Sequence, residues 1–234
     1  MPASFPIEAL KAQAVVARTY ALKKIQEGKK LTDTVSTQSY KDNNELKGLW
    51  ESSYEAYYQK VKMAVEATKG LVLYYEEDLI DAVYHSVSNG QTEDSMYVWG
   101  SEIPYLKSVD SSWDRKVSSY TKTITKDFNI VMQLLGITKE STNIEILSRD
   151  ISGRVLKIKA GNQEFSGVEF RNLLGLRSTD FDFSIEDGNM IITTRGFGHG
   201  VGMSQYGASG MAKEGYQYEK ILKHYYTGIS IHES

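Results

Sequence analysis

The 234-residue chain contains no cysteine, so disulfide bonds, thiolate catalysis and cysteine-based zinc sites are excluded. Lysine and arginine number 27 against 30 aspartates and glutamates, and this balance leaves no basic excess to hold the phosphates of a nucleic acid. No stretch approaches the roughly 20 apolar residues of a membrane span, and no apolar signal core follows a basic start. We therefore expect contact with a membrane only through an anchor that this sequence does not contain.

Glycine, in contrast, is concentrated in one short segment. From Gly196 to Gly210 the sequence reads Gly-Phe-Gly-His-Gly-Val-Gly-Met-Ser-Gln-Tyr-Gly-Ala-Ser-Gly. Residues without a Cβ atom let another backbone or a ligand approach closely. Neither Gly-x-Gly-x-x-Gly nor Gly-Lys-Ser/Thr occurs here, so nucleotide binding is not expected. A tight packing turn is one interpretation. Four polar side chains favour a binding site instead: His199, Ser204, Gln205 and Tyr206.

A second polar cluster follows a predicted strand, where loops commonly present binding groups. It contains His85, Ser86, Ser88 and Asn89. A simple Ser-Asn-Gly turn would explain the same residues. A serine nucleophile is conceivable, but no Gly-x-Ser-x-Gly elbow occurs. The two histidines with Glu93 or Asp94 could form a metal site, but the His-Glu-x-x-His spacing is missing. We therefore predict neither a metal nor a cofactor.

Apolar periodicity predicts a mixture of helices and strands. Apolar residues recur at three- and four-residue steps from Ile7 to Ile25, which indicates a helix, and its many alanines predict close packing. The polar region 31–47 is typical of an exposed loop. Further helices are expected at 54–68, 127–135, 168–174, 203–213 and 218–225. Strands are expected at 71–75, 80–87, 120–125, 144–147, 155–158, 181–185 and 190–194.

This order of elements predicts an α+β fold with two lobes. Residues 1–114 and 188–234 are expected to form the larger, mixed helix and strand lobe. Residues 115–187 are expected to form a smaller α+β lobe inserted into it. We expect a groove between the two lobes, lined by the polar clusters at 85–89 and 199–206 together with the start of the helix at Ile7.

Three motifs are distributed over nearly the whole length of the chain. They are Glu8-Ala-Leu-Lys-Ala-Gln-Ala-Val-Val-Ala-Arg-Thr-Tyr20, His85-Ser-x-Ser-x-Gly90 and Gly198-His-Gly-Val-Gly-Met-Ser-Gln-Tyr-Gly-Ala208. In this order they resemble the stage II sporulation protein D family, which includes amidase-enhancer relatives. The resemblance implies a peptidoglycan lytic transglycosylase that cuts peptide-free glycan strands during engulfment of the forespore and leaves 1,6-anhydro-muramyl ends.

The resemblance also implies a cellular location and a partner protein. Members of the family are expected to be membrane-anchored outside the cytoplasm, beside a partner amidase, stage II sporulation protein P. The polar clusters at 85–89 and 199–206 would then bind denuded glycan. The alternative is a noncatalytic cell-wall-binding or amidase-enhancing module that uses the same groove.

The position of the catalytic acid is the remaining expectation. In the family pattern the proposed glutamate stands immediately before a Met-Pro dipeptide, and here that dipeptide is Met1-Pro2. We therefore expect the acid before Met1, and little or no cleavage by the chain as given. Glu8 is the nearest carboxylate and the catalytic candidate within the sequence. Its other interpretation is a residue of the first helical turn, favoured there by the helix dipole.

Overall fold

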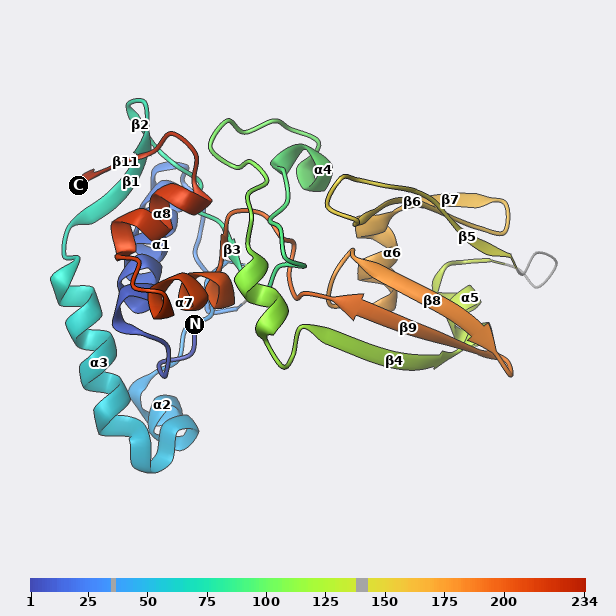
Figure 1. The fold of residues 1–234 in the computed structure, drawn as a ribbon, viewed down its shortest axis with the longest axis horizontal. Coiled ribbons are helices and arrows are strands. Elements are labelled where there is room, and N and C mark those ends of the chain that lie inside the picture. The colour runs from blue at the N-terminus through green and yellow to red at the C-terminus, as the bar shows by residue number, and fades with distance from the viewer. Residues whose placement is uncertain (35–36, 138–142) are drawn as a thin grey trace.

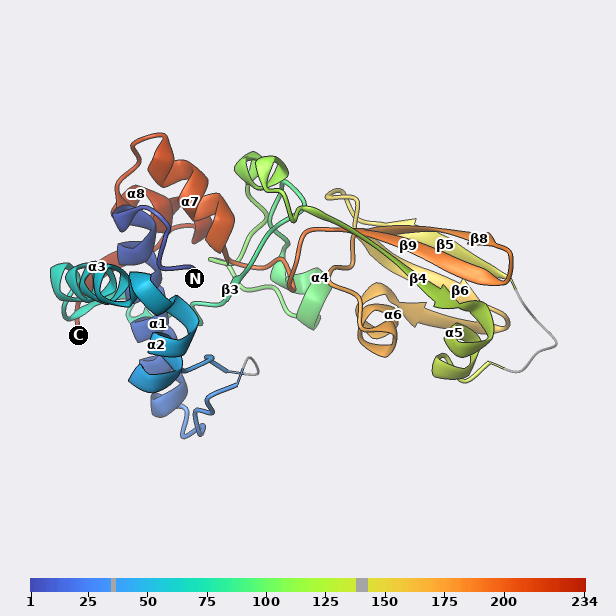
Figure 2. The same ribbon diagram turned by 90° about the horizontal axis from the view of Figure 1, so that it is seen from below.

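The fold is elongated, with a mainly helical half and a half that contains most of the strands. It is a computed structural model that describes residues 1–34, 37–137 and 143–234. A narrower waist of loops and short elements joins the two halves (Figures 1 and 2). Both helices and several small sheets are present, which confirms the predicted α+β class.

The helical half is built around α1 (Ile7–Gln26), which confirms the first predicted helix. Its buried face carries small side chains, including Ala9 and Ala12, so neighbouring elements approach its backbone closely. The helices that pack on it are α3 (Tyr54–Ala67), α7 (Gln205–Lys213) and α8 (Tyr218–Tyr225). An antiparallel sheet of order β11-β1-β2 covers the edge of this half, with β1 (Leu71–Tyr75), β2 (Asp78–Leu79) and β11 (Ser230–Glu233).

Two distant segments run side by side through the waist. Strand β3 (Tyr84–His85) pairs in parallel with β10 (Met203–Ser204). Two isolated bridges add further contacts between these segments, an antiparallel one between Val87 and Phe197 and a parallel one between Glu93 and Val201. The glycine segment therefore lies along the 84–93 segment. The short elements α4 (Ser95–Trp99) and η2 (Ser112–Lys116) complete the waist.

The other half contains two three-stranded antiparallel sheets. The first has the order β4-β9-β8, with β4 (Thr121–Asp127), β8 (Phe181–Glu186) and β9 (Asn189–Arg195). The second has the order β5-β6-β7, with β5 (Ile144–Arg149), β6 (Val155–Ala160) and β7 (Gln163–Ser166). Helices α5 (Phe128–Leu134) and α6 (Gly167–Leu174) lie on one side of the strands (Figure 2).

Each half has its own hydrophobic core. The first core includes Val16 of α1 and Tyr225 of α8, and the second includes Phe170 of α6 and Phe181 of β8, whose rings stack with centroids 5.3 Å apart. The predicted lobe boundary between residues 187 and 188 falls in the turn of the β8–β9 hairpin, and both strands of that hairpin belong to the same sheet. The division at 115 and 187 stays a prediction.

Local sequence signals explain most of the elements, with two corrections. The predicted strand 80–87 is confirmed only in part, because within this range only β3 (Tyr84–His85) is a strand, and pairing is interrupted between Leu79 and Tyr84. The predicted loop 31–47 is wrong at its end, where α2 (Asn43–Trp50) begins. Asp42 caps α2 in a capping box with Glu45, a local hydrogen-bonding signal that the polar composition concealed. Strands β7 and β11 were not predicted. None of the described helices combines the length and the apolar character that a membrane span requires.

Candidate functional site

A cavity of about 490 Å³ opens at the waist, and we call it the histidine pocket. His85 and His199 both line it, with ring centroids 5.7 Å apart. The parallel pairing of β3 with β10 brings them together, although they are far apart in the sequence. Aromatic rings and the first residue supply further walls: Tyr20, Tyr84, Trp99, Phe197 and Met1. The prediction that the two polar clusters share one groove is therefore confirmed for the histidines.

Val201 fixes the orientation of both imidazole rings. Its backbone N–H donates to Nδ1 of His199 over 3.1 Å, so the ring proton of His199 is on Nε2. Nε2 donates that proton to the carbonyl oxygen of Tyr84, also over 3.1 Å. The carbonyl oxygen of Val201 accepts from Nδ1 of His85 over 3.1 Å. His199 is thus held by two backbone hydrogen bonds, one that it donates and one that it accepts.

Burial keeps both imidazoles neutral. It lowers the pKa of His199 to about 4, and it holds the pKa of His85 well below its usual range. A neutral ring can donate or accept a hydrogen bond but adds no charge. The two histidines can thus form hydrogen bonds with ligand hydroxyl groups without adding positive charge to the pocket.

The glycines are required by the close approach of the two segments. A Cβ atom on Gly198 would lie 2.7 Å from the Cβ of His85, and one on Gly202 would lie 2.2 Å from the carbonyl oxygen of Val83. Both glycines have positive φ angles, +119° and +69°, which other residues rarely adopt. The glycine segment therefore forms both a tightly packed turn and part of the pocket wall, as its two interpretations suggested separately.

The other predicted site residues divide between the pocket and its surroundings. Ser86 and Gln205 line the histidine pocket, and the side-chain amide of Gln205 donates to Gln13 on α1 over 3.1 Å. Tyr206, the next residue, lines a different cavity. Its ring meets the edge of Phe5 with centroids 4.8 Å apart.

Ser88 and Ser204 point into a buried network around Asp114. Their hydroxyls donate to the Asp114 carboxylate over 2.6 Å and 2.9 Å, and Ser111 donates to it over 2.8 Å. Burial raises the pKa of Asp114. Ser204 also caps α7, where its hydroxyl accepts from the backbone N–H of Gly207. These two serines hold the waist together and do not line the histidine pocket.

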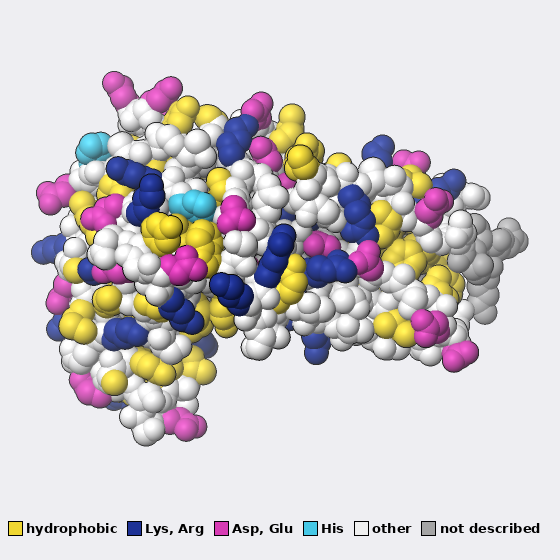
Figure 3. Space-filling view, in the orientation of Figure 1, with side chains coloured by type: hydrophobic (Ala, Val, Ile, Leu, Met, Phe, Trp, Pro, Cys, Tyr) yellow, Lys and Arg dark blue, Asp and Glu magenta, His cyan; other side chains and the backbone are white. Residues whose placement is uncertain are grey.

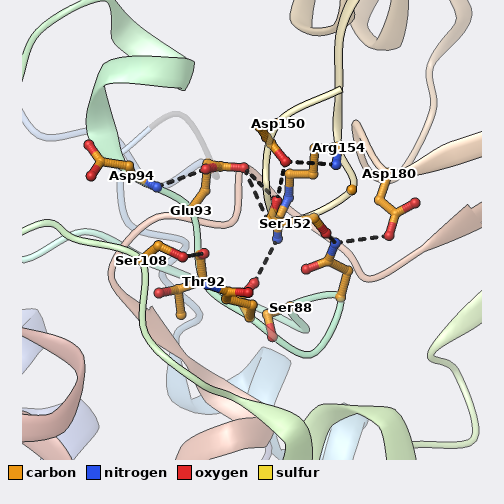
Figure 4. A network of polar contacts seen from close by, with 12 residues as sticks. Ser88, Thr92, Glu93, Asp94, Ser108, Asp150, Ser152, Arg154 and Asp180 are labelled. Atoms are coloured by element: carbon orange, nitrogen blue, oxygen red, sulfur yellow. Dashed lines mark hydrogen bonds and ion pairs between the residues drawn. The ribbon is translucent and has the colours of Figure 1, made fainter. Parts of the chain in front are cut away.

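Asn89 belongs to the contact between the two halves. Its side-chain amide donates to the carbonyl of Ser152 over 2.8 Å and to the carboxylate of Asp180 over 2.9 Å. Figure 4 shows the same region, where Glu93 faces Arg154 across the waist. Their side chains are 2% and 3% exposed, and Arg154 donates to Glu93 over 3.2 Å. Burial raises the pKa of Glu93 to about 7.

Arg154 contacts the backbone of the glycine segment next to His199, a residue of the histidine pocket. A Cβ on Gly200 would lie 2.7 Å from the Arg154 guanidinium, so this side chain rests directly on the glycine segment. Glu93 holds the same residue, because its backbone N–H donates to the carbonyl of Gly200 over 2.8 Å. Gly200 separates His199 from Val201. The sequence analysis missed Arg154, because nothing local marks an arginine that pairs across 61 residues.

Glu8 lies outside the histidine pocket. Its carboxylate accepts from the backbone N–H of Tyr218 over 3.0 Å, at the start of α8, and from Lys11 over 2.7 Å. An acid at a helix N-terminus compensates unpaired backbone donors there. This position favours a structural role for Glu8. Within the described ranges, no group of three or more His, Asp or Glu side chains could hold a metal ion.

Comparison with known proteins agrees with the motifs. A family model described as "Stage II sporulation protein" matches residues 1–75. The whole chain aligns with "Stage II sporulation protein D" of Bacillus amyloliquefaciens at 41% identity over 244 residues, covering 71% of that protein. The chain belongs to the stage II sporulation protein D family. The protein of the same name from Bacillus subtilis (strain 168) is also 41% identical, again with 71% of its length covered.

A more distant relative within this family bears a different name. The "Amidase enhancer" of Bacillus subtilis (strain 168) is 33% identical over 290 residues, with 99% of this chain and 39% of that protein covered. The resemblance stated from the three motifs is therefore confirmed, and the chain is a sporulation protein by family.

Proposed function

We propose that this family member contributes the glycan-binding fold of a lytic transglycosylase that acts on peptide-free peptidoglycan strands. One observation carries the proposal. Met1, which directly follows the catalytic glutamate in the family pattern, lines the histidine pocket together with His85 and His199. A glutamate joined to Met1 would thus enter the pocket beside two neutral imidazoles.

The chemistry needs a single carboxyl group. The acid protonates the bridging oxygen while the bond from that oxygen to C1 of the muramyl sugar breaks. The C6 hydroxyl of the same sugar then attacks C1, and its proton passes to the carboxylate. The 1,6-anhydro ring forms, the acid is regenerated, and no water is consumed. Most other glycosidases require a second carboxylate for the nucleophile or the base.

The environment of Met1 suits such an acid. Met1 is partly buried where it lines the pocket, because its side chain packs against the core of the helical half. The same burial would raise the pKa of a carboxyl group and keep it protonated near neutral pH. No Asp or Glu of the described residues lines the pocket, which leaves the position before Met1 as the source of the acid.

The pocket also offers groups that can hold a sugar. Tyr20, Tyr84 and Trp99 line it, and aromatic rings can pack against the apolar faces of sugar rings. The amide of Gln205 and the hydroxyl of Ser86 lie in the same lining.

We also propose that the protein acts outside the cytoplasm, anchored to the membrane during engulfment, beside the amidase stage II sporulation protein P.

A noncatalytic role is the second proposal, supported by the name of one relative, "Amidase enhancer". In that case the pocket would bind peptide-free glycan and present it to an amidase without cleaving it. The two proposals share the same ligand and differ only in the products.

Digestion of peptide-free glycan strands separates the two. We expect a version extended before Met1 with glutamate to release anhydro-muramyl ends, detected by mass spectrometry. The matched version extended with glutamine should fold and bind without releasing them. Equal release by both would contradict the upstream acid, and Glu8→Gln would then test the remaining candidate. Binding without release by either would support the noncatalytic role.

A further inference from the structure

A second cavity, of about 280 Å³, lies between α7, η2 and the N-terminal segment, and we call it the α7–η2 pocket. Three aromatic rings line it: Phe5, Trp113 and Tyr206. Trp113 rests directly on α7, because a Cβ on Gly210 would lie 2.4 Å from the Trp113 Cβ. These rings are thus held by packing before any ligand arrives.

The charged groups of this lining are mainly cationic. Lys116 and Lys213 both belong to it, with Glu214 as the acid beside them. Both lysines are exposed, and neither forms an ion pair with another described residue. Lys and Arg side chains follow one another across this face, from α7 over η2 toward β9 (Figure 3). An anion that approaches this face would meet free ammonium groups.

The wall of this cavity also contains an unpaired buried hydroxyl. The side chain of Ser209 on α7 lines the cavity and is 2% exposed. Its hydroxyl has no hydrogen-bond partner among the described residues. Buried hydroxyls are normally paired, so this unpaired group distinguishes the wall of the cavity from ordinary core packing.

We propose that the α7–η2 pocket binds a sugar that carries a free carboxylate. Its aromatic rings contact the apolar face of the sugar, and Lys116 and Lys213 attract the carboxylate. This inference rests on the proposed function, because a muramyl sugar exposes a lactyl carboxylate only after its stem peptide has been removed. In the intact wall the same carbonyl is tied up in an amide bond. The pocket would thus recognise the removal of the peptide as a negative charge.

The arrangement of the two pockets suits one continuous glycan strand. Gln205 lines the histidine pocket and Tyr206 lines the α7–η2 pocket. The N-terminal segment likewise contributes Met1 to the first and Phe5 to the second. Adjacent sugars of one strand could therefore occupy both.

Isothermal titration calorimetry with paired ligands tests this inference. The first ligand is a peptide-free glycan oligosaccharide with free lactyl carboxylates, and the second is the same oligosaccharide with those carboxylates methyl-esterified. We expect the protein to bind the acid about tenfold more tightly than the ester, the scale of a charge-assisted hydrogen bond. The double variant Lys116→Met, Lys213→Met should bind both ligands with the weaker affinity that the unaltered protein shows for the ester.

Lys122→Met is the matched control, because Lys122 is an exposed lysine on β4 in the other half. It should keep the full preference for the acid. Equal binding of acid and ester by the unaltered protein would overturn this inference and leave the proposed function standing. A preference that survives in the double variant would also overturn it. Failure of both ligands to bind would overturn the inference and the proposed function together.

Discussion

Arg154 and Glu93 form a buried ion pair across the waist, with 3.2 Å between the guanidinium nitrogen and the carboxylate oxygen. Arg154 belongs to the turn before β6, whereas Glu93 follows the His85 motif. Both residues contact Gly200, Arg154 through its side chain and Glu93 through its backbone N–H. This pair therefore connects the strand-rich half to the segment that carries His199.

Loss of this pair should destabilise the fold strongly. Arg154→Met would leave Glu93 buried without its cation, which typically costs about 3–5 kcal/mol where Glu93 is ionised, above its pKa of about 7, and less at lower pH, where Glu93 takes up a proton. Lys157→Met is the matched control, because Lys157 lies in an exposed pair 3.8 Å from Glu164 and should contribute less than about 1 kcal/mol. Urea unfolding measures both. An equal decrease in the free energy of unfolding in both variants would show that the buried pair stabilises the fold no more than the exposed pair does.

Glu93 and His199 should affect stability in opposite directions with pH. The pKa of Glu93 is raised from 4.5 to about 7, so the folded protein holds this proton more tightly and the free energy of unfolding falls as pH rises between these values. The pKa of His199 is lowered from 6.5 to about 4, so its contribution rises with pH over that range. In Glu93→Gln, stability should rise more steeply between about pH 4.5 and 6.5 than in the unaltered protein. Parallel profiles from urea unfolding would contradict the raised pKa.

His199→Ala should weaken both stability and glycan binding. The change leaves the Tyr84 carbonyl and the Val201 N–H without their partner, at a cost of about 1–3 kcal/mol. It also removes the ring that packs beside Trp99, with centroids 5.5 Å apart, in the pocket wall. His232→Ala, at an exposed site on β11, should change stability by less than about 0.5 kcal/mol. Unchanged thermal stability with lost glycan turnover would instead indicate a direct chemical role for His199.

Two helical glycines should respond oppositely to alanine. In Gly207→Ala the new Cβ would lie 2.0 Å from the Tyr225 hydroxyl and 2.3 Å from the Ser111 hydroxyl, so buried groups must shift, at a cost of about 1–3 kcal/mol. Gly48→Ala, in α2, meets nothing within 4 Å and should stabilise by roughly 0.5–1 kcal/mol. Thermal unfolding of both variants checks the signs. A stabilised Gly207→Ala would show that the contacts around Asp114 give way readily.

Local signals in the sequence determined much of the fold. The apolar repeat from Ile7 placed α1, and Asp127 marked the start of α5, where its carboxylate accepts from the N–H groups of Asn129 and Ile130. The Asp187-Gly188-Asn189 turn fixed the β8–β9 hairpin. Such signals succeed because caps, turns and periodic faces depend on residues only a few positions apart.

The sequence also determined the family and which segments to examine. Its three motifs gave the resemblance that the comparisons confirm, and two of them contain His85 and His199. Residue type alone could not distinguish residues that line the pocket from residues that stabilise the fold around it. Ser88 and Ser204 resembled ligand-binding residues, yet both donate to Asp114 inside the waist. A hydroxyl suits either task, and only its surroundings decide which one it performs.

The tertiary structure alone decided how the two halves meet. Nothing near Arg154 in the sequence indicates that it pairs with Glu93, since the two residues are 61 positions apart. The same holds for Tyr206, which faces the α7–η2 pocket while Gln205 beside it faces the histidine pocket. Periodicity records which side of an element is apolar, but the partners of a buried charge depend on how distant elements pack. Desolvation penalises a buried charge, and only a counter-charge brought in by packing offsets that penalty.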